Sequence, residues 1–406
     1  MISQSVLLLV LPVPVFRVGE DLFFDSQAQN GLQQWLRNFD RIILAVIARN
    51  GQPLGGTTPL KLSDYGGRCE LVILPERYGI AQFLLALPTI VPTLGKLIDR
   101  STHLHFAIGG LAGDWAAVGA LLAHRKGRTG SVWTDRVESE VTRLRASTDH
   151  GLRRIYRSAI AYGMKHYERF VIRRTALGLF HGADCFNAYA AFSPNPHLVH
   201  DIHLKPDARI TPTALAAKCE GATHGRPLNI IYAGRAHPDK GVMDWIETLL
   251  ALRQTDVPYV ATWYGDGPEL EAARRRVQDL GLSDLVHFPG RSDDRDSLMR
   301  ALQMADIFLF CHKTPESPRC LIEALISGTP IFGYRSAYPE DLIAKHGGGT
   351  LTPMDPQLLA EAVRSIDSNR ERLQSLFGQA ANDGYPHTDE DVFRHRADLI
   401  KAFAGS

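Results

Sequence analysis

The sequence predicts an α/β fold made of two doubly wound domains, each a parallel β-sheet covered by helices and facing the other across a cleft. Two observations support this prediction. Apolar runs of strand length alternate with helix-sized segments along the whole chain, which is the pattern of βαβ units. The 406 residues are also about two to three times the length of a typical domain, so a single hydrophobic core is not expected.

The composition is that of an ordinary globular protein, with 45% hydrophobic residues and with 45 Lys and Arg against 44 Asp and Glu. A net charge of +1 gives no overall attraction to nucleic acid, so we expect no nucleic-acid partner. The five cysteines form no Cys-x-x-Cys unit. This pattern argues against a zinc site or a disulfide framework and favours a reducing cytoplasm.

In the first half, strands are expected at five apolar runs: Val6–Leu11, Arg41–Ile47, Cys69–Leu74, His103–Ile108 and Ser131–Thr134. Helical segments are expected at Gln27–Asn38, Asp114–Arg125 and from about Gly151 to Leu179. The apolar start of the chain has no preceding positive charge, so we predict a buried first strand rather than a signal peptide. Pro88 and Pro92 interrupt the apolar stretch Ile80–Ile98, so we predict that it does not span a membrane.

The second half shows the βαβ pattern more clearly, over about 160 residues. Its expected strands are Asn229–Ala233, Tyr259–Tyr264, Leu285–Phe288, Asp306–Phe310, Pro330–Gly333 and Gly349–Leu351, each followed by a helix-sized segment. Residues 195–226 lack a strong period and are interpreted as a hinge. We therefore expect one domain over residues 1–205 and a second over 206–388, with a helix in 389–406 packing back on the first.

Ligands of open parallel sheets bind at the carboxyl ends of strands, so the chemistry is expected in the loops there. The segment Cys311–Tyr334 leaves a strand, makes a short loop and opens a helix, for which Ser317 suits the N-cap. The next amides, of Arg319, Cys320 and Leu321, would then point out of the positive end of the helix dipole. Such an end binds phosphate well.

Two further loops carry candidate ligand groups. After a strand that ends at Gly234, Arg235 and Lys240 are suited to clamping a diphosphate, although each alone could be an ordinary surface cation. The turn Gly265–Pro268 follows the next strand. The acidic run Asp293–Asp296 could suggest a metal site, but its position before a helix is explained by capping.

These segments, in this order, resemble the nucleotide-sugar domain of the retaining glycosyltransferases of family four, the group 1 type with the GT-B fold. The resemblance runs from about Asn229 to Val363. It implies that Arg235, Lys240 and the helix amides hold the diphosphate of the donor. It also implies that Glu323 holds the ribose and that Glu316 contacts the donor sugar, although six residues separate these glutamates, one fewer than the family's usual pattern.

The first domain departs from the family. Many members carry a His after the fifth strand that contacts the donor sugar, whereas this chain has Thr134 and Asp135 there. Asp135 and His105 are the candidates for this face of the cleft. With Glu316, they complete the set of residues for which we predict a catalytic role.

The resemblance implies a retaining hexosyltransferase that transfers a sugar from a UDP- or GDP-linked donor, with no metal ion or other cofactor. The expected acceptor is a glycan or a lipid-linked glycan of a surface polysaccharide. Two alternatives stay open, a catalytically silent partner subunit of the same fold and a nucleotide-sugar epimerase of similar architecture.

Residues 141–175 contain nine Lys or Arg against two acids, with aromatic residues interleaved. A helix of this kind binds an anionic membrane surface, although a long domain helix with a solvated basic face has the same composition. We therefore expect a cytoplasmic protein that associates with the inner face of the cell membrane.

Overall fold

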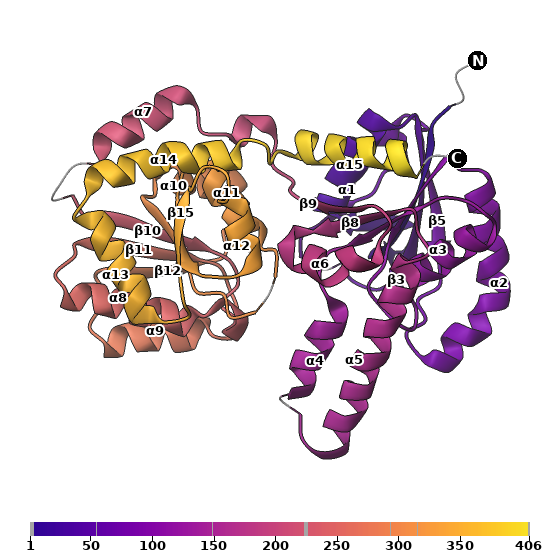
Figure 1. Ribbon diagram of the computed structural model, residues 1–406, viewed down its shortest axis with the longest axis horizontal. Helices are drawn as coiled ribbons and strands as arrows, with labels where there is room; N and C mark the ends of the chain where they lie inside the picture. Colours follow the sequence, from indigo (N-terminus) through magenta and orange to yellow (C-terminus); the bar gives the residue numbers. More distant parts are fainter. Residues whose placement is uncertain are drawn as a thin grey trace. The chain divides into compact units, whose positions relative to one another are not determined.

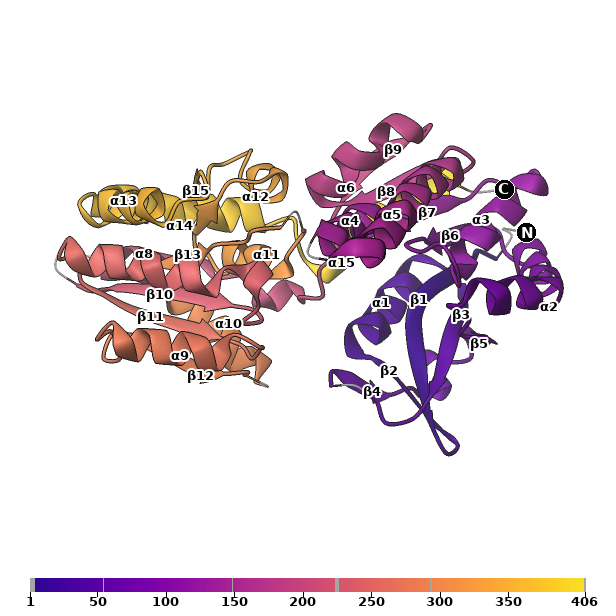
Figure 2. The ribbon, with the colours of Figure 1, turned by 90° about the horizontal axis from the view of Figure 1, so that it is seen from below.

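The computed structural model describes residues 4–53, 55–147, 149–222, 226–292, 294–314 and 316–404. The chain divides into two compact units, Met1–His203 with Asp389–Ser406, and Leu204–Thr388. Each unit contains a largely parallel sheet covered by helices (Figures 1 and 2). The predicted α/β class is confirmed.

The sheet of the first unit is built around β1 (Val6–Val18), the expected buried first strand. Its parallel strands, in order across the sheet, are β5 (Cys69–Leu74), β3 (Arg41–Asn50), β1, β6 (His103–Ala107), β7 (Ser131–Thr134), β8 (Leu177–His181) and β9 (Pro196–Val199). The short strands β2 (Asp21–Asp25) and β4 (Thr57–Pro59) add an antiparallel extension to the end of β1. The register of β1 with β3 shifts between Leu11 and Val15, where prolines cannot donate to the ladder.

Seven α-helices surround this sheet in the described ranges: α1 (Ser26–Asn38), α2 (Ile80–Asp99), α3 (Trp115–Arg125), α4 (Glu138–Ser147), α5 (Gly151–Ile172), α6 (Gly182–Tyr189) and α15 (Asp389–Phe403). Helix α1 packs against α15, and α2 packs against α3. Helices α4 and α5 pack against each other as a hairpin, which Figure 1 shows projecting from the body of the unit.

The last helix is held on the first unit by buried polar contacts. Arg396 of α15 is 5% exposed, and its guanidinium lies 4.1 Å above the centre of the Trp133 ring. The same side chain pairs with Asp201 at 3.0 Å. At the start of α15, Asp389 accepts a hydrogen bond from Gln34 of α1 at 3.0 Å.

The sheet of the second unit is parallel throughout. Its strands, in order, are β12 (Val286–Gly290), β11 (Tyr259–Tyr264), β10 (Leu228–Ala233), β13 (Ile307–Phe310), β14 (Ile331–Tyr334) and β15 (Gly349–Thr352). Its α-helices in the described ranges are α7 (Pro212–Gly221), α8 (Val242–Gln254), α9 (Leu270–Asp279), α10 (Arg295–Met304), α11 (Arg319–Ile326), α12 (Ala337–Leu342), α13 (Pro356–Asp367) and α14 (Arg370–Gly384).

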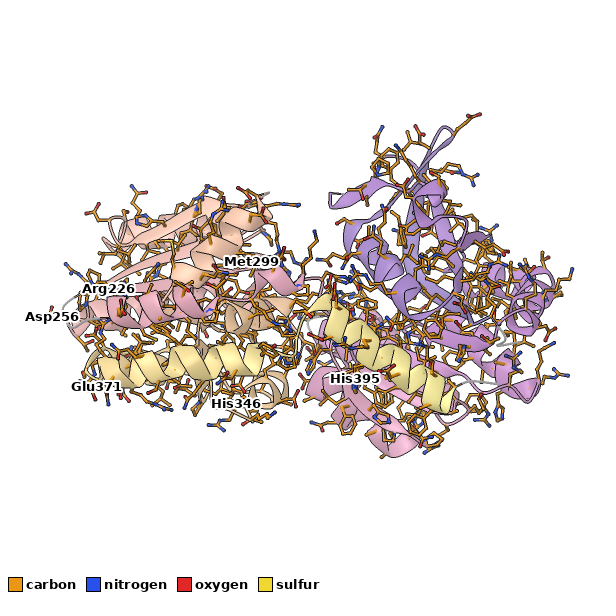
Figure 3. The ribbon with its side chains drawn as sticks, turned by 90° about the horizontal axis from the view of Figure 1, so that it is seen from above. Arg226, Asp256, Met299, His346, Glu371 and His395 are labelled. Carbon is orange, nitrogen blue, oxygen red and sulfur yellow. The ribbon has the colours of Figure 1, made fainter. Side chains whose placement is uncertain are left out.

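The helices of the second unit form two groups. Helix α8 packs against α9 and α13, and α11 packs against α10 and α14. Figure 1 shows these groups on opposite faces of the sheet. Arg226 and Asp256 lie together at one end of the unit, where β10 and β11 begin (Figure 3). The loops that carry the candidate ligand groups follow the opposite ends of these strands.

One prediction about the region before β10 is wrong. The helix expected to reach Leu179 ends at Ile172, because the fully buried apolar run Leu177–His181 joins the sheet as β8. The boundary between the two units, at His203 and Leu204, falls within the segment interpreted as a hinge, but this segment also contains β9 and the helix α7. The hydroxyl of Thr211 caps α7 by accepting from Ala214 N at 3.2 Å, a local signal that the weak hydrophobic period hid.

The prediction that prolines interrupt the stretch Ile80–Ile98 is also wrong. Helix α2 continues through Pro88 and Pro92. Among the described residues, it is the one helix long and apolar enough to cross a membrane. Its second half is part of the hydrophobic core of the first unit, where Leu94 and Ile98 are fully buried.

Candidate functional site

The candidate site lies where the second sheet reverses its strand order. Strand β10 pairs with β11 on one side and with β13 on the other. The loop after β10 leads to α8 and the loop after β13 leads to α11, so the chain leaves these neighbouring strands for helices of the two different groups. A crevice at such a switch point is the usual ligand site of open α/β sheets.

The backbones of these two loops touch. Gly241 has φ +67°, and a Cβ atom there would lie 2.1 Å from the carbonyl oxygen of Cys311. The amide of Lys313 donates to the carbonyl of Asp239 at 2.9 Å. The approach therefore requires glycine at position 241, both for its left-handed conformation and for its missing side chain.

The glycine turn after β11 supports the same loop from the other side. A Cβ on Gly265 would lie 2.0 Å from the carbonyl oxygen of Gly234, and one on Gly267 would lie 2.3 Å from that of Ala236. The amide of Ala236 donates to the carbonyl of Asp266 at 2.9 Å. Three strand ends thus hold the loop that carries Arg235 and Lys240.

The structure brings two of the predicted ligand residues together. Lys240 Nζ forms an ion pair with Glu316 Oε1, joining the loop after β10 to the loop after β13. Only 13% of the Lys240 side chain is exposed, whereas Arg235 is exposed. One cation of the predicted diphosphate clamp is thus held in place by a carboxylate, and the other faces solvent.

Glu323 lies on α11 and is 7% exposed. A carboxylate with so little contact with water needs a partner, and Arg295 supplies it, with Nη2 2.5 Å from Oε1. Arg295 is the first residue of α10 and was not predicted as a site residue. It belongs to the acidic run for which capping was expected, and Asp294 does cap α10 by accepting from Ser297 N at 3.0 Å. Asp293 lies outside the described residues.

A second residue missed from the sequence is His312, two residues after the end of β13. Its Nε2 lies 2.8 Å from Tyr232 Oη, and its Nδ1 lies 4.0 Å from Glu316 Oε1. Burial lowers the pKa of His312 well below its ordinary value, and the charge of Lys240 lowers it further. The imidazole is therefore neutral at physiological pH. Its position after a buried strand is the signal that could have identified it.

The start of α11 differs from the prediction. The helix begins at Arg319, and Pro318, with ψ 123°, is its N-cap in place of Ser317. The amide of Leu321 donates to the carbonyl of Pro318 at 3.2 Å, so the predicted group of three outward amides is reduced by one. Burial also raises the pKa of the Cys320 thiol to about 12, so this side chain is uncharged.

The candidates in the first unit occupy different environments. Asp135 follows β7 with an exposed side chain, and His181 Nε2, at the end of β8, lies 4.0 Å from its carboxylate. His105 is interior, 1% exposed, with Nδ1 2.8 Å from Ser131 Oγ. The interior position contradicts the catalytic role predicted for His105, because a substrate cannot reach its ring there. Strand β6 is covered on both faces, so both Leu104 and His105, which point to opposite faces, are buried.

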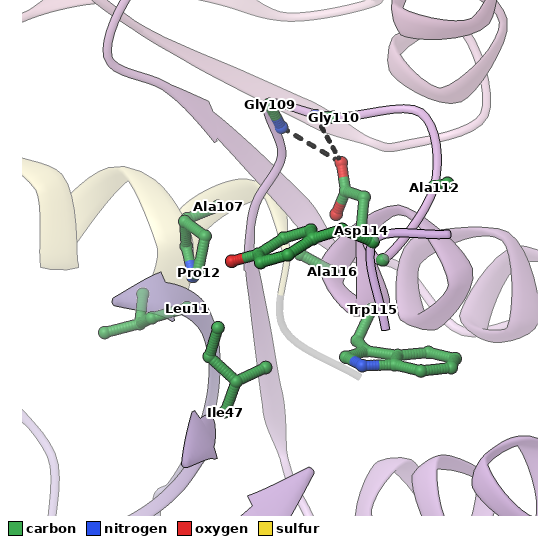
Figure 4. A pocket seen from close by; sticks show the side chains of 12 residues that line it. Leu11, Pro12, Ile47, Ala107, Gly109, Gly110, Ala112, Asp114, Trp115 and Ala116 are labelled. Atoms are coloured by element: carbon green, nitrogen blue, oxygen red, sulfur yellow. Dashed lines mark hydrogen bonds between the residues drawn. The ribbon is translucent and has the colours of Figure 1, made fainter. Parts of the chain in front are cut away.

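The first unit also has a small pocket beside the middle of β1, near the end of β3 and at the carboxyl end of β6 (Figure 4). Its volume is about 80 Å³, and its apolar lining includes Ile47, Tyr78 and Trp115. The carboxylate of Asp114 accepts from the amides of Gly109 and Gly110 at 3.0 Å and closes the loop over the pocket. The sequence carried no motif that marked this pocket.

Residues 220–383 match the family described as "Glycosyl transferases group 1". This match covers nearly all of the second unit. The second unit is a group 1 glycosyltransferase domain. The whole chain has the GT-B fold, as the similar solved structures show.

Among these structures, HepE from Anabaena in complex with UDP has a TM-score of 0.67 at 14% identity and covers 98% of this chain and 100% of its own. WaaG, described as a glycosyltransferase involved in lipopolysaccharide biosynthesis, has a TM-score of 0.61 at 14% identity and covers 97% and 99%. At this identity, the similarity concerns the fold.

Curated relatives match over shorter ranges. The lipopolysaccharide core biosynthesis glycosyltransferase LpsE of Rhizobium meliloti is 26% identical over 223 residues, 50% of this chain and 62% of its own. An exopolysaccharide phosphotransferase of Streptomyces coelicolor is 28% identical over 166 residues, 40% of this chain and 17% of its own. The matches thus span less than two thirds of the length of these relatives.

The loop packing in the group 1 domain predicts that Gly241→Ala destabilises the protein more than Gly281→Ala. Both positions have φ near +66°, but a Cβ on Gly281 has no heavy atom within 4 Å among those described. Gly281→Ala should therefore cost only the left-handed strain, about 1 to 2 kcal/mol. Gly241→Ala adds a clash of the new Cβ atom with the carbonyl oxygen of Cys311. Urea unfolding of both variants measures the difference, and equal losses would contradict the packing.

The burial of His105 predicts a pH dependence of stability. Burial lowers its pKa to about 3, so below about pH 6.5 the unfolded chain takes up a proton that the folded chain does not. The free energy of unfolding should fall as the pH decreases from 7.5 to 5, by about 2 kcal/mol from this residue. His105→Gln should lose less stability over this range. An identical pH profile for both proteins in urea unfolding would refute this assignment.

Proposed function

We propose that the protein is a retaining glycosyltransferase that transfers a hexose from a nucleoside diphosphate sugar to a glycan or lipid-linked glycan. The observation that carries the proposal is the pair of ion pairs at the switch point of a group 1 domain, Lys240 with Glu316 and Arg295 with Glu323. These pairs place cations for a diphosphate beside carboxylates for hydroxyl groups. This combination matches the chemistry of a sugar nucleotide.

In the proposed reaction, the bond between the anomeric carbon and the diphosphate oxygen breaks. The bond to the acceptor oxygen forms on the same face of the sugar. Arg235 and Lys240 stabilise the negative charge that develops on the leaving diphosphate, and these fixed charges act without reorganisation. The acceptor's proton passes to a leaving phosphate oxygen, so the step balances without a side-chain base.

Donor binding would exchange partners within the site. In the structure, Lys240 is paired with Glu316, and Arg295 is paired with the buried Glu323. A diphosphate offers Lys240 a stronger anion, and this releases Glu316 toward the donor sugar. His312, neutral and 4.0 Å from Glu316, stays beside the carboxylate after the exchange. Glu323 then accepts from the ribose hydroxyls.

The relatives support a role in surface polysaccharide assembly. LpsE and WaaG are described as acting in lipopolysaccharide biosynthesis, and other relatives carry the description of putative colanic acid biosynthesis glycosyltransferases. HepE has been solved with UDP and with UDP-glucose. We therefore favour a UDP-linked donor over a GDP-linked one and propose a cytoplasmic location at the inner face of the membrane.

The α4–α5 hairpin is the proposed contact with that membrane. At its tip, Leu152 is 85% exposed, and Ile155 and Tyr156 beside it are also exposed. Arg153 and Arg154 lie between these side chains in the sequence. Apolar side chains interleaved with cations suit the interface of a bilayer that contains anionic lipids.

We expect Lys240→Ala and Glu323→Ala to weaken the binding of UDP, each by about 10- to 100-fold, because each removes a charge-assisted hydrogen bond. Isothermal titration calorimetry with UDP measures the effect. Arg276→Ala is the matched control, since this exposed arginine of the same unit pairs with Glu247 on its surface. Unchanged affinity in both site variants would refute the donor site.

Product analysis separates the proposed transfer from its alternatives. Incubation with the donor alone should release the sugar slowly by hydrolysis and give no epimer. Conversion of the donor sugar to its epimer would establish an epimerase instead. UDP binding without turnover, with or without a glycan acceptor, would indicate a catalytically silent partner subunit.

A further inference from the structure

The first half of α2 presents an exposed apolar face, while Phe83, Ala86 and Leu87 on its other face pack against the core of the first unit. Leu85 is 81% exposed, and Ile80 and the preceding Tyr78 are 61% and 57% exposed. The second half of the same helix, by contrast, packs Leu94 and Ile98 into the core. Exposed large apolar side chains that gather in this way mark an interaction surface.

The sheet topology places this surface on the same edge of the unit as the α4–α5 hairpin. Strands β5 and β7 run parallel in one sheet, so their carboxyl ends lie at one edge. Helix α2 follows β5, and α4 follows β7. Figure 1 shows the lower end of α2 and the hairpin on the same side of the unit.

The charge of this edge decides what covers the surface. The hairpin, residues 138–172, carries seven Lys or Arg against four acids. A second copy of the chain would bring the same excess of positive charge to the contact. An anionic bilayer instead satisfies both features, because its headgroups attract the cations and its hydrocarbon accepts the apolar side chains.

We infer that the exposed face of the first half of α2 lies in the interface of an anionic membrane as a monotopic anchor, beside the hairpin. Phe83, Ala86 and Leu87 hold the other face of this half against the core of the first unit, and the second half is buried there too. The helix therefore contacts one leaflet without crossing the bilayer. This inference extends the proposed membrane contact of the hairpin. It rests on the proposed function only where it concerns how a lipid-linked acceptor reaches the protein.

The anchor would bring the pocket of Figure 4 to the lipid surface. Tyr78 belongs to the exposed surface and also lines that pocket. An acceptor with a lipid chain would then reach the apolar pocket without leaving the membrane. Arg77, exposed next to Tyr78, is placed to meet a phosphate at headgroup depth.

Vesicle flotation with the full-length protein tests the anchor. The triple variant Ile80→Ser, Leu84→Ser and Leu85→Ser should bind vesicles of phosphatidylcholine with phosphatidylglycerol about tenfold or more weakly in high salt, where screening leaves mainly the apolar contribution. Arg153→Glu with Arg154→Glu should lose binding mainly in low salt. Met304→Ser, at a 73% exposed position of the second unit, is the control and should bind like the unaltered protein.

Three outcomes would overturn the inference. The triple variant could bind vesicles as tightly as the unaltered protein in high salt, which would leave no role for α2. The unaltered protein could be a dimer in light scattering that the triple variant converts to a monomer, which would assign the surface to a second copy. Resistance of the unaltered protein to carbonate extraction would indicate a spanning helix. The triple variant should bind UDP with the affinity of the unaltered protein in calorimetry. A loss of membrane binding is then distinguished from a defect of the donor site.

Discussion

The hydrogen-bonded pairing of β10 with β13 is the constraint on which the candidate site depends. These strands are about 75 residues apart in the sequence, yet the backbone of one aligns Ile230 with Ile307 of the other. Their adjacency brings the loop of Lys240 against the loop of Glu316. Gly241 and the turn around Gly265 then allow the backbones to approach as closely as they do. Without this pairing, the cations and carboxylates of the second unit would be separate surface charges.

The electrostatics of the site follow from this geometry. Glu323 is nearly inaccessible to water, and burying its carboxylate would be costly without Arg295, a cation from a neighbouring helix. The side chain of Lys240 is likewise largely buried beside Glu316. A ligand must therefore offer each charged group a partner at least as good as the one that it replaces. A diphosphate joined to a polyhydroxylated sugar offers both kinds of partner in one molecule.

The two units have similar sheets but place different kinds of side chain at the carboxyl ends of their strands. The second unit gathers charges at the carboxyl edge of its strands, whereas the first gathers apolar and basic side chains at the corresponding edge, on α2 and on the α4–α5 hairpin. Polar hydrogen-bonding groups suit a soluble nucleotide, and apolar surface with cations suits an acceptor held in a membrane. His105 pairs with Ser131 at the start of β7 and is buried, whereas Asp135 follows the end of β7 and is open to a ligand.

The sequence by itself determined the class of the fold, most strands and the loops that carry Arg235, Lys240, Glu316 and Glu323, because alternation, glycine turns and strand ends are local signals. It did not predict that Leu177–His181 is a strand or that α2 continues through its prolines, since short apolar runs suit either structure until burial decides. Only the tertiary structure decided which charges meet. The packing of α10 against α11 brings Arg295 to Glu323, and no local pattern records this contact, whereas the strand order brings His312, which follows a buried strand, to Tyr232 and Glu316.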